Sequence, residues 1–356
     1  MLDFCRNFNM MIPLVLAPMG GGPSTPELTA AVSNAGGLGS LAAAYSNPEK
    51  IRQDIARVRA LTERPFAVNL FSPQSLEPLR GDVDEVSAFL QQFHQRLGLG
   101  PPQLPKQPGE NFDQQIDAIL EMKPAIVSFT FGLLPPEAVA RLKSESIFLV
   151  GTATTVDEAR QLEQSGVDAV VAQGSEAGAH RGTFSVKAED ALIGTAALIP
   201  QVVDATSIPV VASGGIMDGR GIVAALALGA CAVQMGTAFL AAKEAGTSPG
   251  YRAALLKASE DQTTTTRAFS GRMARGIRNE FIESWNDAGI TNLSYPWQNA
   301  FTQPMRRAAS EARQSGMLSL WAGQGVGLIR EGSAQELISH WKAEMKTTLA
   351  NLAQAL

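Results

Sequence analysis

The sequence predicts a (β/α)8 TIM barrel, and three observations support this fold class. Short apolar segments that suit buried parallel strands alternate with segments of helical periodicity. Eight such repeats fill roughly 240 residues, which is the length and rhythm of a (β/α)8 barrel. An open doubly wound sheet is the alternative, but it normally shows Gly-x-Gly-x-x-Gly after the first strand. Gly20-Gly21-Gly22-Pro23 breaks that pattern through its proline and its missing third glycine.

The strands are expected at short apolar runs that end in polar or glycine-rich segments. In chain order they are residues 14–18, 39–44, 66–71, 126–131, 148–152, 169–172, 209–213 and 232–235. The apolar run at 12–17 follows Asp3 and lacks a clean small-residue cleavage site, which favours a first strand over a signal peptide.

Helices are expected between these strands. Thr25 followed by Pro26 is a typical helix start, and Gly36-Gly37 ends that helix. The others are expected at residues 48–61, 112–122, 136–144, 156–165, 188–203 and 218–228. The excursion after the third strand, with a helix over 83–97 and a proline-rich segment at 101–105, is an insertion.

The apolar stretch 222–242 is long enough to suggest a membrane span. Gly229, Gln234 and Gly236 argue against one, because they divide the stretch into a helix and the eighth strand.

The alternation of strand and helix stops at about residue 242. We therefore expect residues 1–241 to form the barrel and residues 242–356 to form a mainly helical subdomain packed on it. Its helices are expected at residues 251–258, 277–287, 305–315 and 334–355. The sequence leaves open whether the chain returns to the barrel near its C-terminus.

The composition favours a small-molecule enzyme over a nucleic-acid or membrane protein. The chain has 356 residues, 45% of them hydrophobic, and its net charge of -5 is spread without basic clusters. Cys5 and Cys231 lie far apart without Cys-x-x-Cys spacing, and no histidine cluster suggests a metal. We expect a cytoplasmic protein with reduced cysteines and no metal; the sequence does not distinguish a monomer from a dimer.

One polar loop carries the strongest chemical signal. The buried strand at 169–172 leads into Gln173 and then into Gly174-Ser175-Glu176-Ala177-Gly178-Ala179-His180-Arg181-Gly182. His180 is one of three histidines, and an imidazole that titrates near neutrality suits proton transfer. The alternative for any single histidine is a hydrogen bond within the core or a turn.

This loop resembles the Gly-x-Glu-Ala-Gly-Gly-His-x-Gly signature of class I nitronate monooxygenases, formerly called 2-nitropropane dioxygenases. Ala179 stands where the family usually has glycine, and the added methyl group removes no chemical group. The downstream segments 266–276, 295–299 and 320–325 also resemble blocks of this family, so the resemblance covers nearly the whole chain.

The resemblance implies an FMN cofactor. Two glycine loops, Gly214-Gly215 after the seventh strand and Gly236 after the eighth, suit a phosphate, although phosphosugar isomerases use the same device. We also expect Asp218 to cap the helix that follows, and the loop amides and the N-terminus of that helix to present partial positive charge to the phosphate. Asn69 and Gln173 offer uncharged amides to a flavin ring. The expected cofactor-binding residues are Ala17, Pro18, Met19, Gly20, Asn69, Gln173, Gly178, Gly214, Gly215, Gln234, Met235, Gly236 and Thr237.

His180 is the expected general base, because removal of a proton next to a nitro group needs a positioned proton acceptor. Glu176 either orients His180 or is a structural carboxylate, and the structural role is favoured. Ser128, Thr130 and Tyr295 are expected on the substrate side.

The expected function is oxidation of alkyl nitronates by O2 to an aldehyde and nitrite, with propionate 3-nitronate as a candidate. The nearest alternative is an FMN-dependent enoyl-acyl-carrier-protein reductase that uses NAD(P)H. Two alternatives outside the flavin-dependent oxidoreductases are a phosphosugar isomerase and a non-catalytic flavin-binding barrel. The sequence does not identify the physiological nitronate.

Overall fold

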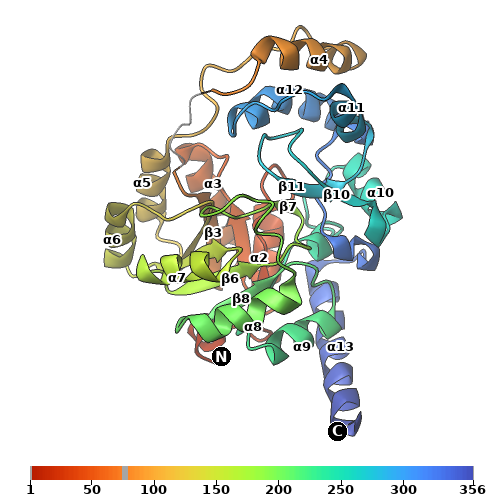
Figure 1. Ribbon diagram of the computed structural model, residues 1–356. Coiled ribbons are helices and arrows are strands. Elements are labelled where there is room, and N and C mark those ends of the chain that lie inside the picture. Colours follow the sequence, from red (N-terminus) through yellow and green to blue (C-terminus); the bar gives the residue numbers. More distant parts are fainter. Residues whose placement is uncertain (1, 74–78, 356) are drawn as a thin grey trace.

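A closed parallel barrel forms the body of the molecule in the computed structural model, which describes residues 2–73 and 79–355 (Figure 1). The strand order is β1-β9-β8-β6-β5-β4-β3-β2, and all pairs are parallel. A parallel bridge from Val15 to Leu38 joins β1 to the segment before β2 and closes the ring. The barrel strands are β1 Leu14–Leu16, β2 Gly39–Ala42, β3 Phe66–Phe71, β4 Ile126–Thr130, β5 Phe148–Ala153, β6 Ala169–Gln173, β8 Val210–Ser213 and β9 Ala232–Met235. The predicted (β/α)8 fold is confirmed.

Helices surround the barrel and bury their apolar faces against it. Local sequence sets where they begin: the Thr25 hydroxyl accepts the Leu28 amide, the Asn47 side chain accepts the Lys50 amide, and a proline follows each cap. The surrounding helices are α2 Pro26–Asn34, α3 Pro48–Leu61, α5 Phe112–Met122, α6 Pro136–Ser144, α7 Val156–Gln164, α8 Thr195–Ala205, α9 Gly219–Ala227 and α13 Ala334–Ala355.

The last helix, α13, packs on α9 and α2, so the chain does return to the barrel after its C-terminal excursion. In Figure 1 the far end of α13 projects beyond the barrel.

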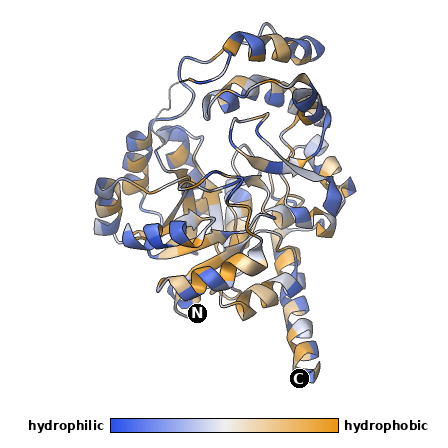
Figure 2. Ribbon diagram, viewed as in Figure 1, coloured by the Kyte–Doolittle hydropathy of each residue, from blue (hydrophilic) through white to orange (hydrophobic). Residues whose placement is uncertain are grey.

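Hydrophobic residues concentrate on the barrel strands (Figure 2), and buried residues of the strands and the surrounding helices form one hydrophobic core. The amino-terminal end of the barrel is covered by α1, Leu2–Asn7, which the sequence did not predict. Phe4 and Phe8 pack edge-to-face with each other, and Phe8 also packs against Phe148 of β5.

A lid with its own hydrophobic core covers the opposite end of the barrel. It contains α4 Val83–Arg96, α10 Pro249–Lys257, α11 Glu280–Ala288 and α12 Trp297–Glu311. Figure 1 shows α4, α11 and α12 together above the barrel. The Phe269 and Phe281 rings stack in this core with centroids 4.7 Å apart. The insertion that supplies α4 follows the third strand, as predicted.

The lid also holds a small antiparallel sheet that the sequence did not predict. Its strand order is β10-β11-β7, with β10 Thr263–Thr266, β11 Ala274–Ile277 and β7 Ala179–His180. Short 3-10 helices are η1 Thr237–Phe239, η2 Glu260–Gln262, η3 Ser315–Met317 and η4 Gln324–Leu328. Because His180 pairs with Ala274, this sheet fixes the predicted catalytic loop to the lid.

Three predicted helix starts are wrong. The helix expected from residue 188 begins at Thr195, because residues before Gly194 form a loop whose Ala191 carbonyl accepts the Arg181 guanidinium. The helix expected from 277 begins at Glu280, since Ile277 belongs to β11 and Asn279 is the cap. The helix expected from 305 begins at Trp297 and contains Pro304 in its interior.

Among the described residues, no helix is both long and apolar enough to cross a membrane. The apolar stretch 222–242 divides into α9, β9 and η1, in agreement with the sequence prediction.

Candidate active site

A cavity of about 560 Å³ lies between the carboxyl ends of the barrel strands and the lid. This is the end of a (β/α)8 barrel at which active sites are found. The predicted residues in its wall are Ala17, Pro18, Met19, Gly20, Asn69, Ser128, Thr130, Gln173, Gly178, His180, Gly214, Gly215, Gln234, Gly236 and Thr237. Two predicted residues lie behind the wall: the Met235 side chain is buried in the barrel core, and the Tyr295 ring packs on His180 with centroids 5.9 Å apart.

His180 lies at the centre of an aromatic enclosure. Its ring contacts Phe131, Tyr295 and Trp321 at centroid distances between 5.6 and 5.9 Å. The adjacent Ala179 has φ of 62°, a left-handed conformation that costs an alanine free energy. The loop thus holds His180 in the cavity wall through a strained turn.

The cavity keeps the imidazole of His180 neutral. Burial lowers its pKa to about 3, and the nearby positive charges of Arg272 and Arg306 act in the same direction. A neutral imidazole has a free lone pair and can accept a proton.

Hydrogen bonds around Ser270 identify which nitrogen of His180 is free. The Ser270 hydroxyl lies 2.8 Å from His180 Nε2 and donates its hydrogen to the Arg272 carbonyl at 3.0 Å. A hydroxyl has one hydrogen, so Nε2–H must be the donor to Ser270. In this tautomer the lone pair of the His180 imidazole lies on Nδ1.

The structure shows Glu176 to be a structural carboxylate, the role that the sequence favoured. It accepts the Thr195 amide at 2.9 Å and the Thr195 hydroxyl at 2.8 Å, and no described contact joins it to His180. Arg181, next in the chain to His180, is buried and donates to the Gly174 and Ala191 carbonyls. These two side chains set the shape of the loop.

Three amide side chains at strand ends face the cavity with hydrogen-bonding capacity to spare. Asn69 uses one N–H, toward Ser128 at 3.1 Å. Gln173 donates to the His180 carbonyl at 3.1 Å and accepts the Gly182 amide at 2.8 Å. Gln234 lines the cavity, and its side-chain amide makes no hydrogen bond to any described residue. Such a set fits the polar edge of a flavin ring.

The two glycine loops bring backbone amides to the wall of the cavity. Gly214 and Gly215 have φ of 116° and 71°, conformations that glycine adopts without strain. A Cβ on Gly236 would lie 3.2 Å from the Ala17 Cβ, so backbone segments approach closely there. The loops therefore fit a phosphate group.

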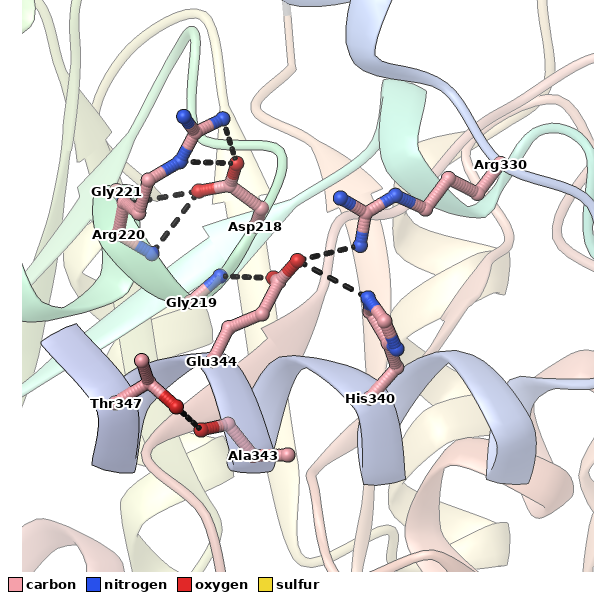
Figure 3. A network of polar contacts seen from close by, with 9 residues as sticks. All are labelled: Asp218, Gly219, Arg220, Gly221, Arg330, His340, Ala343, Glu344 and Thr347. Atoms are coloured by element: carbon pink, nitrogen blue, oxygen red, sulfur yellow. Dashed lines mark hydrogen bonds and ion pairs between the residues drawn. The ribbon is translucent and has the colours of Figure 1, made fainter.

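The expected role of the following helix N-terminus is corrected by the structure (Figure 3). Asp218 caps α9 as predicted, accepting the amides of Arg220 at 3.0 Å and Gly221 at 3.1 Å. The Gly219 amide donates to Glu344 of α13 at 3.0 Å. Since carboxylates occupy these first amides of α9, a phosphate must rely on the loop amides instead.

The sequence did not identify several residues of this site: Tyr45, Phe131, Ser270, Arg306 and Trp321. Most of them come from the lid or from loops remote from the histidine motif, so no local spacing connects them. Ser270 and Trp321 did lie inside segments that resemble the family, and that resemblance was the available signal.

The comparisons with known proteins agree with this architecture. The family model described as nitronate monooxygenase matches residues 4–344. A probable nitronate monooxygenase of Staphylococcus saprophyticus is 42% identical, with 93% of this chain and 94% of that protein covered. One of Bacillus subtilis is 42% identical, with 95% of this chain and 97% of that protein covered.

Solved structures extend the similarity to the fold. Nitroalkane oxidase from Streptomyces ansochromogenes is 40% identical, with a TM-score of 0.89 and coverage of 98% of this chain and 99% of that one. FabK from Thermotoga maritima is 29% identical, with a TM-score of 0.78 and coverage of 99% and 98%. The family consists of flavin-dependent oxidoreductases, and the open amides and glycine loops of the cavity suit a flavin. This chain belongs to the nitronate monooxygenase family.

Proposed function

We propose that the protein is an FMN-dependent monooxygenase that oxidises alkyl nitronates with O2 to an aldehyde and nitrite. The observation that carries this proposal is the neutral His180 in the cavity wall, whose Nδ1 makes no hydrogen bond to any residue that the structure describes. The bound flavin supplies the redox chemistry. The glycine loops at Gly214–Gly215 and Gly236 would hold the phosphate of FMN, and Asn69, Gln173 and Gln234 would surround its ring.

His180 acts on the neutral nitroalkane form of a substrate. Transfer of the proton from the carbon to Nδ1 creates a nitronate anion and an imidazolium cation side by side. The attraction between these charges offsets the low proton affinity that burial gives the imidazole. Phe131, Tyr295 and Trp321 exclude water around the pair, which strengthens that attraction.

Arg306 supports a substrate that carries an acidic group, such as propionate 3-nitronate. Its guanidinium lines the cavity, and no carboxylate of a described residue lies within ion-pair distance. Burial lowers its pKa to about 10, so it stays charged at neutral pH. Nε and Nη2 donate to Thr302 and Asn299 within α12, so these bonds hold the group in place.

The first test is a spectrum of the purified protein followed by anaerobic addition of a nitronate. A flavin spectrum that changes without nicotinamide is the expected result, because the electrons come from the nitronate. The second candidate is the FMN-dependent enoyl-acyl-carrier-protein reductase that the sequence left open as the nearest alternative. Rapid reduction by NADH with no response to nitronates would transfer the assignment to it.

A second test compares propionate 3-nitronate with a propyl nitronate that lacks the carboxylate. Arg306→Met is expected to raise KM for the carboxylated substrate by about tenfold or more, with a smaller change for the other. Arg307→Met is the matched control, since Arg307 also lines the cavity but is largely exposed and already pairs with Glu311. Equal increases for both substrates would assign Arg306 to the nitronate group itself.

A further inference from the structure

The loop after β8 and the helix α9 form one continuous unit. Gly214 and Gly215 line the cavity, Ile216 and Met217 follow, and Asp218 caps α9. Because α9 begins four residues after Gly215, the position of its first turn sets where the loop amides point.

A carboxylate from the far end of the chain holds this first turn. Glu344 of α13 accepts the Gly219 amide through Oε2 at 3.0 Å (Figure 3). Its other oxygen, Oε1, accepts Arg330 Nη1 at 2.7 Å and lies 3.1 Å from His340 Nε2. Three groups thus fix the Glu344 carboxylate at the start of α9.

The two helices meet at a position that only glycine can occupy. A Cβ on Gly219 would lie 2.5 Å from both the Glu344 Cβ and the Met345 amide nitrogen. The α13 backbone therefore rests directly on the first residue of α9.

The chain that leads to α13 touches the loop at a second point. A Cβ on Gly325 would lie 3.0 Å from the Gly215 carbonyl oxygen and 2.5 Å from Met217 Cγ. Residues 325 and 344 therefore hold the loop and the helix behind it from one side.

We propose that Glu344 is a positioning residue for flavin binding, and this rests on the function proposed above. Glu344 does not line the cavity. It fixes α9 so that the amides of Gly214 and Gly215 are arranged before a phosphate arrives. Glycines are conformationally free, so a loop without this support must be ordered at the moment of binding, which weakens affinity.

The test measures FMN affinity of deflavinated protein by fluorescence titration. Glu344→Ala is expected to raise the Kd for FMN about tenfold or more, since it removes the acceptor for the Gly219 amide. Glu344→Gln keeps an acceptor oxygen and is expected to stay within about threefold of wild type. Glu336→Ala is the matched control on the same helix: its carboxylate accepts the Ser333 amide and pairs with Lys243, away from α9.

Riboflavin, which lacks the phosphate, separates positioning of the loop from general loosening of the cavity. Glu344→Ala is expected to leave the riboflavin Kd within about twofold of wild type. Unchanged FMN affinity, an equal loss for FMN and riboflavin, or tighter FMN binding in both Glu344 variants would each overturn the proposal. If the wild-type protein binds no flavin at all, the proposed function itself fails.

Discussion

The Ser270 hydroxyl lies 2.8 Å from Nε2 of His180 and thereby leaves the lone pair of the imidazole on Nδ1. We expect Ser270→Ala to release the imidazole into both tautomers and to lower kcat with a neutral nitroalkane by about 10- to 100-fold. Steady-state kinetics measure this loss, and nitrogen-15 NMR of labelled histidine reports the tautomer directly. Ser310→Ala is the control, because Ser310 lines the cavity without contacting His180. An unchanged tautomer in Ser270→Ala would contradict the assignment.

His180→Asn tests the base itself. Asparagine keeps a polar group but cannot accept a proton at neutral pH. A neutral nitroalkane must lose its proton on the enzyme, whereas a nitronate has already lost it in solution. The variant should lose about two or more orders of magnitude with nitroalkanes and much less with nitronates. Small and equal effects on both forms would remove His180 from the catalytic residues.

The depressed pKa of His180 predicts a pH dependence of stability. The folded-state pKa is about 3, against 6.5 for the unfolded chain, so only the unfolded chain binds this proton between those values. The contribution of the neutral imidazole to the free energy of unfolding is therefore fully present above pH 6.5. It is lost as the pH falls toward 3, by at most about 1.4 kcal/mol per pH unit. Urea unfolding of apo wild type and of His180→Asn between pH 7 and pH 4 measures it. Parallel curves for the two proteins would show that the imidazole is not buried in its neutral form.

Gly215→Val should yield largely flavin-free protein. The residue has φ of 71°, and an added Cβ would lie 3.2 Å from the Glu176 Cβ, so the loop must shift. The ratio of flavin to protein absorbance measures occupancy. Gly289 in the lid has a similar φ of 65°, and a Cβ added there would have no neighbouring atom within 4 Å. Gly289→Val therefore introduces the same backbone strain away from the cavity and should retain flavin. Full occupancy in Gly215→Val would refute the phosphate assignment.

Ala179→Gly should stabilise the protein. The alanine has φ of 62°, and relief of left-handed strain is expected to raise the free energy of unfolding by up to about 1 kcal/mol. Ala177 lies in the same loop but does not have a positive φ. Ala177→Gly should therefore give no such gain, because glycine there only increases the entropy of the unfolded chain. Chemical denaturation of both variants distinguishes the two cases.

The barrel could be predicted from the sequence because each strand and each helix cap is determined by residues that are adjacent in the chain. Asn69 and Gln173 could be predicted as neighbours in the site because each ends a strand, and a parallel barrel brings the carboxyl ends of all its strands to one rim. Ser270 and Arg306 were not predicted as residues of the site, because their positions near His180 depend on how the lid folds back over the barrel. The short strand at Ala179–His180 has no alternation of its own, and it exists only through pairing with Ala274 and Arg275. The boundary expected at residue 241 stays a prediction.

The cavity wall draws on nearly the whole chain, from Ala17 after the first strand to Gly325 before the last helix. During synthesis the amino-terminal half can assemble strands next to each other as they leave the ribosome, but the ligand chamber does not yet exist. Its last wall is supplied by Trp321, Gly323 and Gly325, which follow the eighth barrel strand by more than 80 residues. A chain truncated directly after the eighth barrel strand would therefore keep every strand of the barrel and still lack part of that wall.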